Sequence, residues 1–122
     1  MGIKVFDQTY EALSRALDLR TENQTVIASN IANADTPGYQ AKELSFEKAM
    51  ERALNSDDDP AQVRAEIHNQ INDVVREDGN TVDRDSEMVS LAQNQLLYDA
   101  AADLVKKKLA LLKYSITDGG NH

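Results

Sequence analysis

Apolar residues recur at alternating intervals of four and three along the first part of the chain. The positions that share this spacing are Phe6, Tyr10, Leu13, Leu17, Arg20, Gln24, Ile27 and Ile31, and all but Arg20 and Gln24 are apolar. This spacing places side chains on one face of an α-helix, with the periodicity of a coiled-coil stripe. The pattern therefore predicts a helix from about Asp7 to Asn33, with the Asp7 side chain as its N-cap.

The last part of the chain repeats this pattern more regularly. Its positions are Met88, Leu91, Gln95, Tyr98, Ala102, Val105, Leu109, Leu112 and Ile116, and only Gln95 is polar. They predict a second long helix from about Arg84 to Ile116. Asp83 is its expected N-cap, and the acidic residues that follow complement the positive end of the helix dipole.

The segment between these helices, from Gln40 to Asn80, is less regular. Apolar spacing from Phe46 to Ala53 predicts a short amphipathic helix, and a weaker pattern predicts another between Ala61 and Val75. The sequence Asp78-Gly79-Asn80 is a turn signal. The middle is expected to be irregular or partly flexible.

These patterns predict a mainly α fold. Two long N- and C-terminal helices are expected to pair as an extended coiled-coil-like hairpin, because each carries an apolar stripe that needs a partner. The expected division is an N-terminal helical segment (1–36), a variable middle segment (37–80) and a C-terminal helical segment (81–122). A two-helix hairpin buries little surface, so low stability is expected for the isolated chain.

A second stripe runs beside the first on the N-terminal helix. It consists of Ala12, Ala16, Leu19, Asn23, Val26, Asn30 and Asn33. Small side chains let other helices approach closely, and amides form hydrogen bonds. The stripe therefore predicts packing between chains, with a solvated face carrying incidental asparagines as the alternative.

The N-terminal helix is expected to stop abruptly after this stripe. Pro37 cannot continue a helix, and Gly38 after it favours a type II turn. Asn30 and Asn33 are expected to set register through amide bonds between chains, as a buried asparagine does in coiled coils. A left-handed C-terminal cap at Asn33 is the alternative.

Composition narrows the class of protein. The formal net charge of −8 disfavours nucleic acid as a partner, because phosphate binding needs clustered basic residues. The one basic cluster, Lys106-Lys107-Lys108, is explained by its place near the predicted end of a helix. The chain has no cysteine, and its start lacks the apolar run of a cleaved signal peptide.

Few residues offer catalytic chemistry. The two histidines, His68 and His122, lie outside any serine or cysteine motif. The acidic run from Asp83 to Glu87 departs from a calcium loop, which needs Gly and Glu where this chain has Met88 and Asn94. No phosphate-binding glycine motif or nucleophile elbow occurs. The sequence predicts a protein that is not an enzyme, with no cofactor, metal site or small-molecule substrate.

The sharpest signal is a run of ten residues at the end of the first helix. It reads Asn30-Ile31-Ala32-Asn33-Ala34-Asp35-Thr36-Pro37-Gly38-Tyr39. This run resembles the signature of the flagellar rod and hook axial proteins. The second half, from Asp78, resembles the carboxyl-terminal part of the proximal rod members of that family. Its matching points are Gly79-Asn80-Thr81-Val82-Asp83, Glu87-Met88, and Asn94-Gln95 with Tyr98.

The resemblance implies a structural subunit of the proximal rod of the bacterial flagellum basal body, the drive shaft that transmits torque. In this family the terminal helices form an axial core and pack against neighbouring subunits in a helical tube. Expected partners are copies of the chain, other flagellar rod proteins, the membrane-ring adaptor and the type III export gate. The residues expected to form the assembly stripes are Tyr10, Leu13, Leu17, Ile27, Met88, Leu91, Tyr98, Val105, Leu109 and Leu112.

The resemblance also implies unfolded export from the cytoplasm to the periplasmic rod without a cleaved signal peptide. Phe46 and Met50 match the family's export-gate pattern, a phenylalanine followed four residues later by an apolar residue. Helix packing is the simpler explanation of these two residues. A cytosolic helical adaptor or export chaperone is the alternative function, since acidic charge and amphipathic helices suit that class too. An adaptor, however, has no need of the Thr36–Tyr39 turn.

Overall fold

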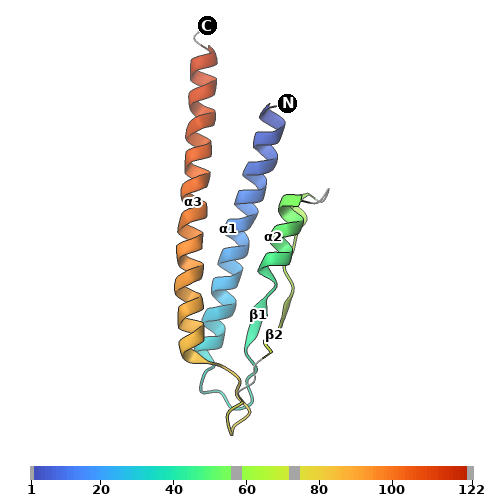
Figure 1. The fold of residues 1–122 in the computed structure, drawn as a ribbon, viewed down its shortest axis with the longest axis vertical. Helices are drawn as coiled ribbons and strands as arrows, with labels where there is room; N and C mark the ends of the chain where they lie inside the picture. Colours follow the sequence, from blue (N-terminus) through green and yellow to red (C-terminus); the bar gives the residue numbers. More distant parts are fainter. Residues whose placement is uncertain (1, 56–58, 72–74, 121–122) are drawn as a thin grey trace.

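Two long helices lie side by side, and a smaller unit packs on one of them. A computed structural model describes residues 2–55, 59–71 and 75–120, with residues 2–7 and 118–120 described as backbone only. The elements in chain order are α1 (Gly2–Ala32), β1 (Lys42–Leu44), α2 (Phe46–Asn55), the 3-10 helix η1 (Pro60–Gln62), β2 (Ile67–Asn69) and α3 (Arg84–Gly120). Figure 1 shows α1 between α3 and the β1–α2 unit, with the connecting loops at one end and both termini at the other. The predicted class, mainly α with paired terminal helices, is confirmed.

The helix ends agree only in part with the expected caps. Asp83 caps α3 as predicted, because its carboxylate accepts a hydrogen bond from the Ser86 backbone N–H at 3.2 Å. Asp7, in contrast, lies inside α1, which begins at Gly2. The cluster Lys106-Lys107-Lys108 lies well before the end of α3, which runs to Gly120. Since the helix dipole acts within the last turn, the dipole explanation of this cluster is wrong.

The middle segment contains one of its two predicted helices. The short helix is confirmed as α2, but the helix expected between Ala61 and Val75 is wrong. Part of that stretch forms β2, which pairs antiparallel with β1 in the register Lys42↔Asn69, Glu43↔His68 and Leu44↔Ile67. Residues 72–74 lie outside the described part of the chain. The helical pattern was weak, and a strand partner only 25 residues away overrode it.

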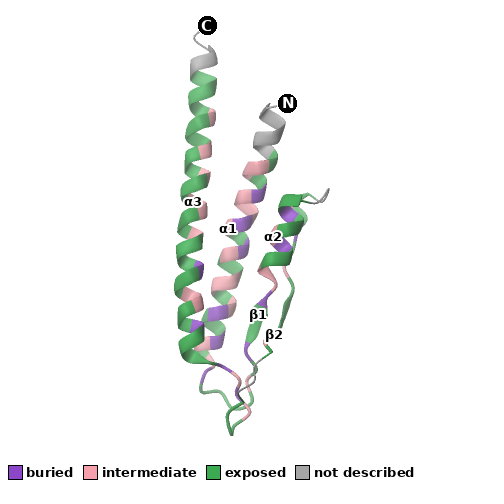
Figure 2. Ribbon diagram, viewed as in Figure 1, coloured by how far each residue is buried: buried purple, intermediate pink, exposed green. Residues whose placement is uncertain are grey.

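The second stripe of α1 packs within the chain. Leu19 is fully buried in a cluster with Ala49, Ala53 and Val63, which come from the middle segment. Ala12 and Ala16 are buried as well. Burial is accordingly concentrated on α1 and the elements facing it, whereas α3 is largely exposed (Figure 2). The part of this stripe from Ala12 to Leu19 is therefore neither an interface between chains nor a solvated face.

The other face of α1 packs against α3, with a shift from the expected stripe. Met88 is 53 % exposed and Gln95 is exposed, whereas their preceding residues Glu87 and Asn94 are both 3 % exposed. Neighbouring residues lie about 100° apart around a helix. The buried face of the first turns of α3 is therefore turned to one side of the predicted stripe, and the half-buried Leu91 and Tyr98 belong to both. Of the N-terminal stripe, Phe6 lies outside the described side chains.

Candidate functional site

Asn30 links the end of α1 to the strand that follows it. The side chain is fully buried, and its Oδ1 accepts hydrogen bonds from the Lys42 backbone N–H at 2.9 Å and the Tyr39 hydroxyl at 3.1 Å. Its Nδ2 donates to the Lys42 carbonyl at 2.8 Å. The amide thus pairs with Lys42 much as a neighbouring strand would. These bonds use both ends of the amide within the chain, which contradicts the expected amide bonds between chains.

The abrupt end of α1 is a tight turn. The Tyr39 backbone N–H donates to the Thr36 carbonyl at 3.2 Å, across Pro37 and Gly38. Gly38 has φ +75°, the left-handed value that a type II turn requires at its third position. Proline at the second position presets the other dihedral angle. The geometry agrees with the predicted turn.

Asn33 stabilises this turn without a left-handed backbone. Among the described residues, only two glycines have positive φ, so the left-handed cap proposed for Asn33 is wrong. Its Nδ2 donates to the Ser29 carbonyl at 2.8 Å, and its Oδ1 lies 3.1 Å from the Thr36 hydroxyl, which donates to it. The asparagine therefore bridges the last helical turn and the loop.

Asn80, from the loop before α3, caps the end of α1. Its side chain is fully buried, and its Nδ2 donates to the carbonyls of Asn33 at 2.9 Å and Thr36 at 2.8 Å. Its Oδ1 accepts from the Val82 backbone N–H and from the Arg76 guanidinium, both at 2.8 Å. The last carbonyls of a helix have no partner within it. Here a residue 47 positions further along the chain than Asn33 supplies one.

Further bonds join the same two segments. The Gly38 backbone N–H donates to the Asp78 carbonyl at 2.8 Å, and the Thr81 backbone N–H donates to the Tyr39 carbonyl at 3.0 Å. The Thr81 hydroxyl accepts from the Ala41 backbone N–H at 2.8 Å. The two segments are therefore held together by backbone and side-chain hydrogen bonds along their length.

We call residues 33–42 and 76–82 the clasp. Its apolar centre consists of the buried side chains Ala34, Ala41 and Val82. The clasp unites the ten-residue signature with the turn before α3. Sequence reasoning identified both stretches but missed their contact, because nothing in the local sequence of either stretch indicates which other segment it packs against.

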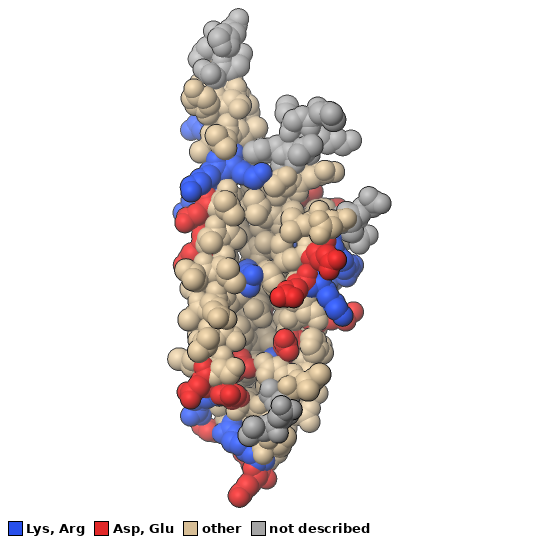
Figure 3. Space-filling model, viewed as in Figure 1, with Lys and Arg blue, Asp and Glu red and all other residues tan. Residues whose placement is uncertain are grey.

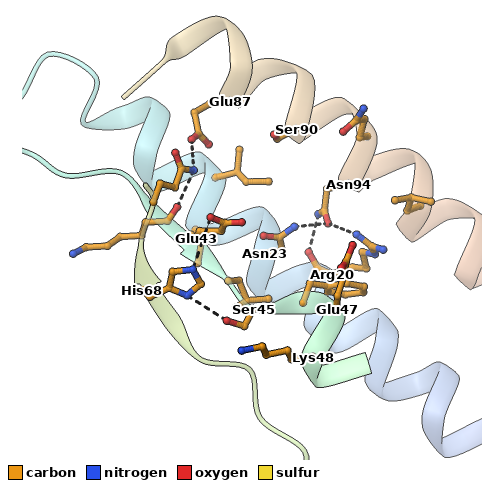
Figure 4. Close-up of a pocket in the computed structure, with 18 of the residues that line it drawn as sticks. Arg20, Asn23, Glu43, Ser45, Glu47, Lys48, His68, Glu87, Ser90 and Asn94 are labelled. Atoms are coloured by element: carbon orange, nitrogen blue, oxygen red, sulfur yellow. Dashed lines mark hydrogen bonds and ion pairs between the residues drawn. The ribbon is translucent and has the colours of Figure 1, made fainter. Parts of the chain in front are cut away.

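A groove of about 960 Å³ lies on the same side of α1 as the small sheet. Val26 and Ile27 of α1 line its floor, Ser90 and Leu97 belong to the α3 wall, and Phe46 belongs to the opposite wall. Figure 4 shows polar side chains on both sides of this space, with Glu87 and Ser90 on α3 and Glu43 on the small sheet. The groove therefore presents apolar and polar groups together.

Glu87, in the first turn of α3, lies at one end of this groove (Figure 4). The side chain is 3 % exposed. Its Oε1 accepts a hydrogen bond from Gln70 Nε2 at 2.8 Å, whereas Oε2 has no partner among the described residues. A buried carboxylate oxygen without a donor is costly. This atom is the one unsatisfied polar side-chain atom that the described part of the chain buries.

Asn94 connects α3 to α1 at the other side of the groove. Its Nδ2 donates to the Arg20 carbonyl and to Gln24 Oε1, both at 2.8 Å. Its Oδ1 accepts from Asn23 Nδ2 at 2.9 Å. A buried amide between two helices fixes their register, because sliding leaves it unpaired. A buried amide that fixes helix register was expected at Asn30 between chains. The structure has one at Asn94 instead, between two helices of the same chain.

Arg20 joins this network to α2. Its guanidinium carbon lies 3.6 Å from the centroid of the Phe46 ring, a cation–π contact. Burial lowers the pKa of Arg20 from its ordinary value, although the group stays cationic at neutral pH. The contact ties the groove wall formed by α2 to its floor.

Comparison with known proteins identifies the family. A family model described as flagella basal body rod protein matches residues 11–40. The flagellar basal body rod protein FlgB of Escherichia coli (strain K12) is 39% identical over 102 residues, covering 68% of this chain and 74% of its own length. FlgB of Bacillus subtilis (strain 168) is 32% identical over 128 residues, covering 96% and 99%. The chain belongs to the FlgB family. FlgB of Salmonella typhimurium is similar too, with 32% identity over 125 residues and coverage of 87% and 90%.

Most side chains of the expected FlgB-type assembly stripes are only half buried in the single chain. Half buried are Tyr10, Leu13, Leu17, Leu91, Tyr98, Val105 and Leu112, and Ile27 is buried. Met88 and Leu109 are exposed. The pairing of α1 with α3 accounts for the covered part of this surface. Contact with neighbouring FlgB subunits stays a prediction.

Phe46 and Met50 are both explained by packing in the folded chain. Both side chains lie against the cluster of Leu19, Ala49 and Val63. Helix packing was the simpler explanation of these two residues from the sequence, and this contact agrees with it. Recognition by an export gate stays a prediction.

Ser45, Glu43 and His68 meet on the small sheet, where sequence reasoning expected a helix for the histidine. His68 Nδ1 lies 3.2 Å from Ser45 Oγ, and His68 Nε2 lies 3.8 Å from Glu43 Oε2. The histidine and glutamate side chains are 51% and 56% exposed, so water screens the pair. We interpret the cluster as a surface contact between strands.

Within residues 2–55, 59–71 and 75–120, no group of three His, Cys, Asp or Glu side chains is placed to hold a metal ion. Over the same residues, no helix combines the length and the apolar character needed to cross a membrane. His122 lies outside this part of the chain.

Proposed function

We propose that the chain is a structural subunit of the proximal rod of the bacterial flagellum basal body, where it assembles by helix packing and transmits torque. The observation that carries the proposal is the match to FlgB of Bacillus subtilis over 96% of the chain. The long α3 supports it, since 37 residues of helix span about 55 Å. Such a rod-like pair offers long surfaces to neighbours on several sides.

The proposed mechanical role has a physical basis in the polar contacts. Torque reaches a subunit of a shaft as shear, which tends to slide α1 along α3. Sliding breaks the hydrogen bonds that Asn94 makes to Arg20, Gln24 and Asn23, and leaves a buried amide unpaired. The clasp opposes the same movement at one end of the helices. Together these contacts make the helix pair suited to transmit force as a unit.

The proposal includes partners and a route. Copies of the chain, other rod proteins and the membrane-ring adaptor are the proposed neighbours in the periplasmic rod. Export proceeds from the cytoplasm in the unfolded state, without a cleaved signal peptide, through the type III gate. Phe46 and Met50 pack against the core in the folded chain, so the gate reads them only before folding.

Genetic complementation tests the proposed function. The full chain, expressed in a flagellated bacterium that lacks its own FlgB, is expected to restore swimming and rods visible by electron microscopy. The chain is also expected in the periplasmic fraction. A chain that stays in the cytoplasm of cells with working export machinery supports the adaptor alternative and contradicts the rod proposal.

A pair of matched variants separates export from stability. Phe46→Ala and Leu19→Ala remove side chains from the same packed cluster. If the gate reads Phe46, secretion falls strongly in Phe46→Ala and little in Leu19→Ala, because export does not require a folded chain. Equal secretion of the two variants contradicts the gate assignment.

A further inference from the structure

One surface of α3 is apolar and uncovered. Leu97, Leu104 and Leu111 are 47 %, 51 % and 64 % exposed and lie seven residues apart, so they form a row along one flank of the helix. Lys107 lies between the last two leucines, is exposed and has no ion-pair partner in the described part of the chain. Figure 3 shows basic atoms gathered on the upper part of α3, above a broad uncharged surface.

We call the segment with Leu104, Lys107 and Leu111 the insert. From Leu104 to Leu111 the helix rises about 10 Å, which is close to two turns. A helix about 10 Å wide occupies roughly 420 Å³ per turn, so the groove of about 960 Å³ has the volume of about two turns. The insert and the groove are therefore comparable in volume.

They are also matched in chemistry. The groove ends at Glu87, a buried carboxylate whose Oε2 has no donor. Its lining includes Val26 and Met50, which are half buried, and Leu97, which is exposed, and these three present apolar surface. The insert offers one ammonium between two leucines. A lysine placed between apolar side chains meets the two needs of such a site, charge neutralisation and apolar contact.

We propose that the insert of one copy occupies the groove of the next copy, with the Lys107 ammonium paired to the Glu87 carboxylate. Leu104 and Leu111 pack on the apolar lining of the groove. The incoming ammonium displaces the Gln70 side chain, a neutral donor to Glu87 at 2.8 Å, and replaces it with a charge-assisted hydrogen bond. This inference rests on the proposed rod function, because it names the contact through which copies assemble.

The location of the two surfaces allows such a contact to repeat from one copy to the next. The groove lies beside the first turns of α3, and the insert lies in the second half of the same helix. Each copy therefore contributes a different surface to the contact, which makes it heterologous. Heterologous contacts whose rotation does not close a ring repeat into an open helical assembly.

Disulfide trapping tests the contact with the full chain, which has no cysteine of its own. Copies carrying Ser90→Cys, in the groove wall, are mixed with copies carrying Leu104→Cys. The control mixes Ser90→Cys with Ala110→Cys, an exposed position about 120° around α3 from Leu104. We expect mixed disulfides to form at least about tenfold faster with Leu104→Cys. Equal rates for the two mixtures overturn the inference.

Charge reversal tests the ion pair. Lys107→Glu is expected to slow trapping in the Ser90→Cys and Leu104→Cys mixture to about the rate of the Ala110→Cys control, and Lys106→Glu, the same change on another face, to have little effect. Glu87→Lys combined with Lys107→Glu is expected to recover most of the rate if the variant remains helical. Because Lys107 is exposed, the single reversal does not disturb folding. Unchanged trapping in Lys107→Glu overturns the pairing with Glu87.

The rod function is tested separately by complementation. If the unaltered chain restores rods but the groove mixture traps no faster than its control, the inference is wrong and the rod function stands. If trapping is specific but rods are not restored, the contact stands and the rod function is wrong.

Discussion

Replacing Asn80 with alanine tests whether the clasp holds the two halves of the chain together. The fully buried amide makes four hydrogen bonds, which join it to Asn33, Thr36, Arg76 and Val82. The variant removes all four hydrogen bonds and changes no other residue of the two segments. We expect a lower free energy of unfolding.

The size of the loss follows from what each partner retains. The carbonyls of Asn33 and Thr36 still accept backbone hydrogen bonds from Thr36 and Tyr39, at 3.1 and 3.2 Å. The buried Val82 N–H, in contrast, loses the acceptor that Asn80 provides. An orphaned buried donor costs about 1–3 kcal/mol. The space left by the amide adds about 1 kcal/mol, so the expected loss is about 2–4 kcal/mol.

Urea denaturation followed by far-ultraviolet circular dichroism measures this loss. With a slope of about 2 kcal/mol per molar urea, the midpoint is expected to fall by about 1–2 M. The control is Asn55→Ala, an exposed asparagine at the end of α2, which is expected to stay within about 0.5 kcal/mol of the unaltered chain. A midpoint for Asn80→Ala equal to that of the unaltered chain refutes the reasoning that the clasp contributes to stability.

The other predictions concern the helix pair, the turn and the core. Asn94→Ala is expected to lower the free energy of unfolding by about 1–3 kcal/mol in thermal melts, whereas Gln95→Ala, at the exposed neighbouring position, is expected to be nearly neutral. Equal losses of stability in these two variants contradict the finding that α3 buries Asn94 and exposes Gln95. Gly38→Ala is expected to cost about 1–2 kcal/mol in urea titrations, because its φ of +75° strains any residue with a Cβ; an unchanged midpoint contradicts this. Leu19→Ala is expected to cost about 2–5 kcal/mol by the same measurement, and the exposed Leu54→Ala much less, so equal losses argue against the α1–α2 core.

The predicted helices show which local signals were sufficient. The period of three and four predicted both long helices, and Asp83 was recognisable as a cap, because each of these features depends on neighbours within a few residues. The same period misplaced Met88 by one position. Spacing by threes and fours leaves the centre of the buried face open by one residue, and the partner helix decides which residue faces it. Glu87 and Asn94 therefore took the buried positions that the stripe assigned to their neighbours.

The middle segment shows where local signals failed. The weak helical pattern after Ala61 lost to pairing with β1, a contact that depends on residues on the far side of α2. Asn30 was recognised as important but assigned to the wrong partner. Its real partner, Lys42, becomes available only because the Thr36–Tyr39 turn reverses the chain and brings the strand back along α1.

The sequence by itself determined the helical class, the turn at Pro37-Gly38, and the family signature, because periodicity, proline and glycine act locally and a signature is read from the order of residues. Only the tertiary structure decided that Asn80 caps α1, that Asn94 sets the register of the helices, and that Glu87 is left with an unpaired oxygen. Hydrogen-bond satisfaction is a property of groups that folding brings together from distant parts of the chain. For that reason, the groove and the clasp became visible only once α1, the middle segment and α3 were in place.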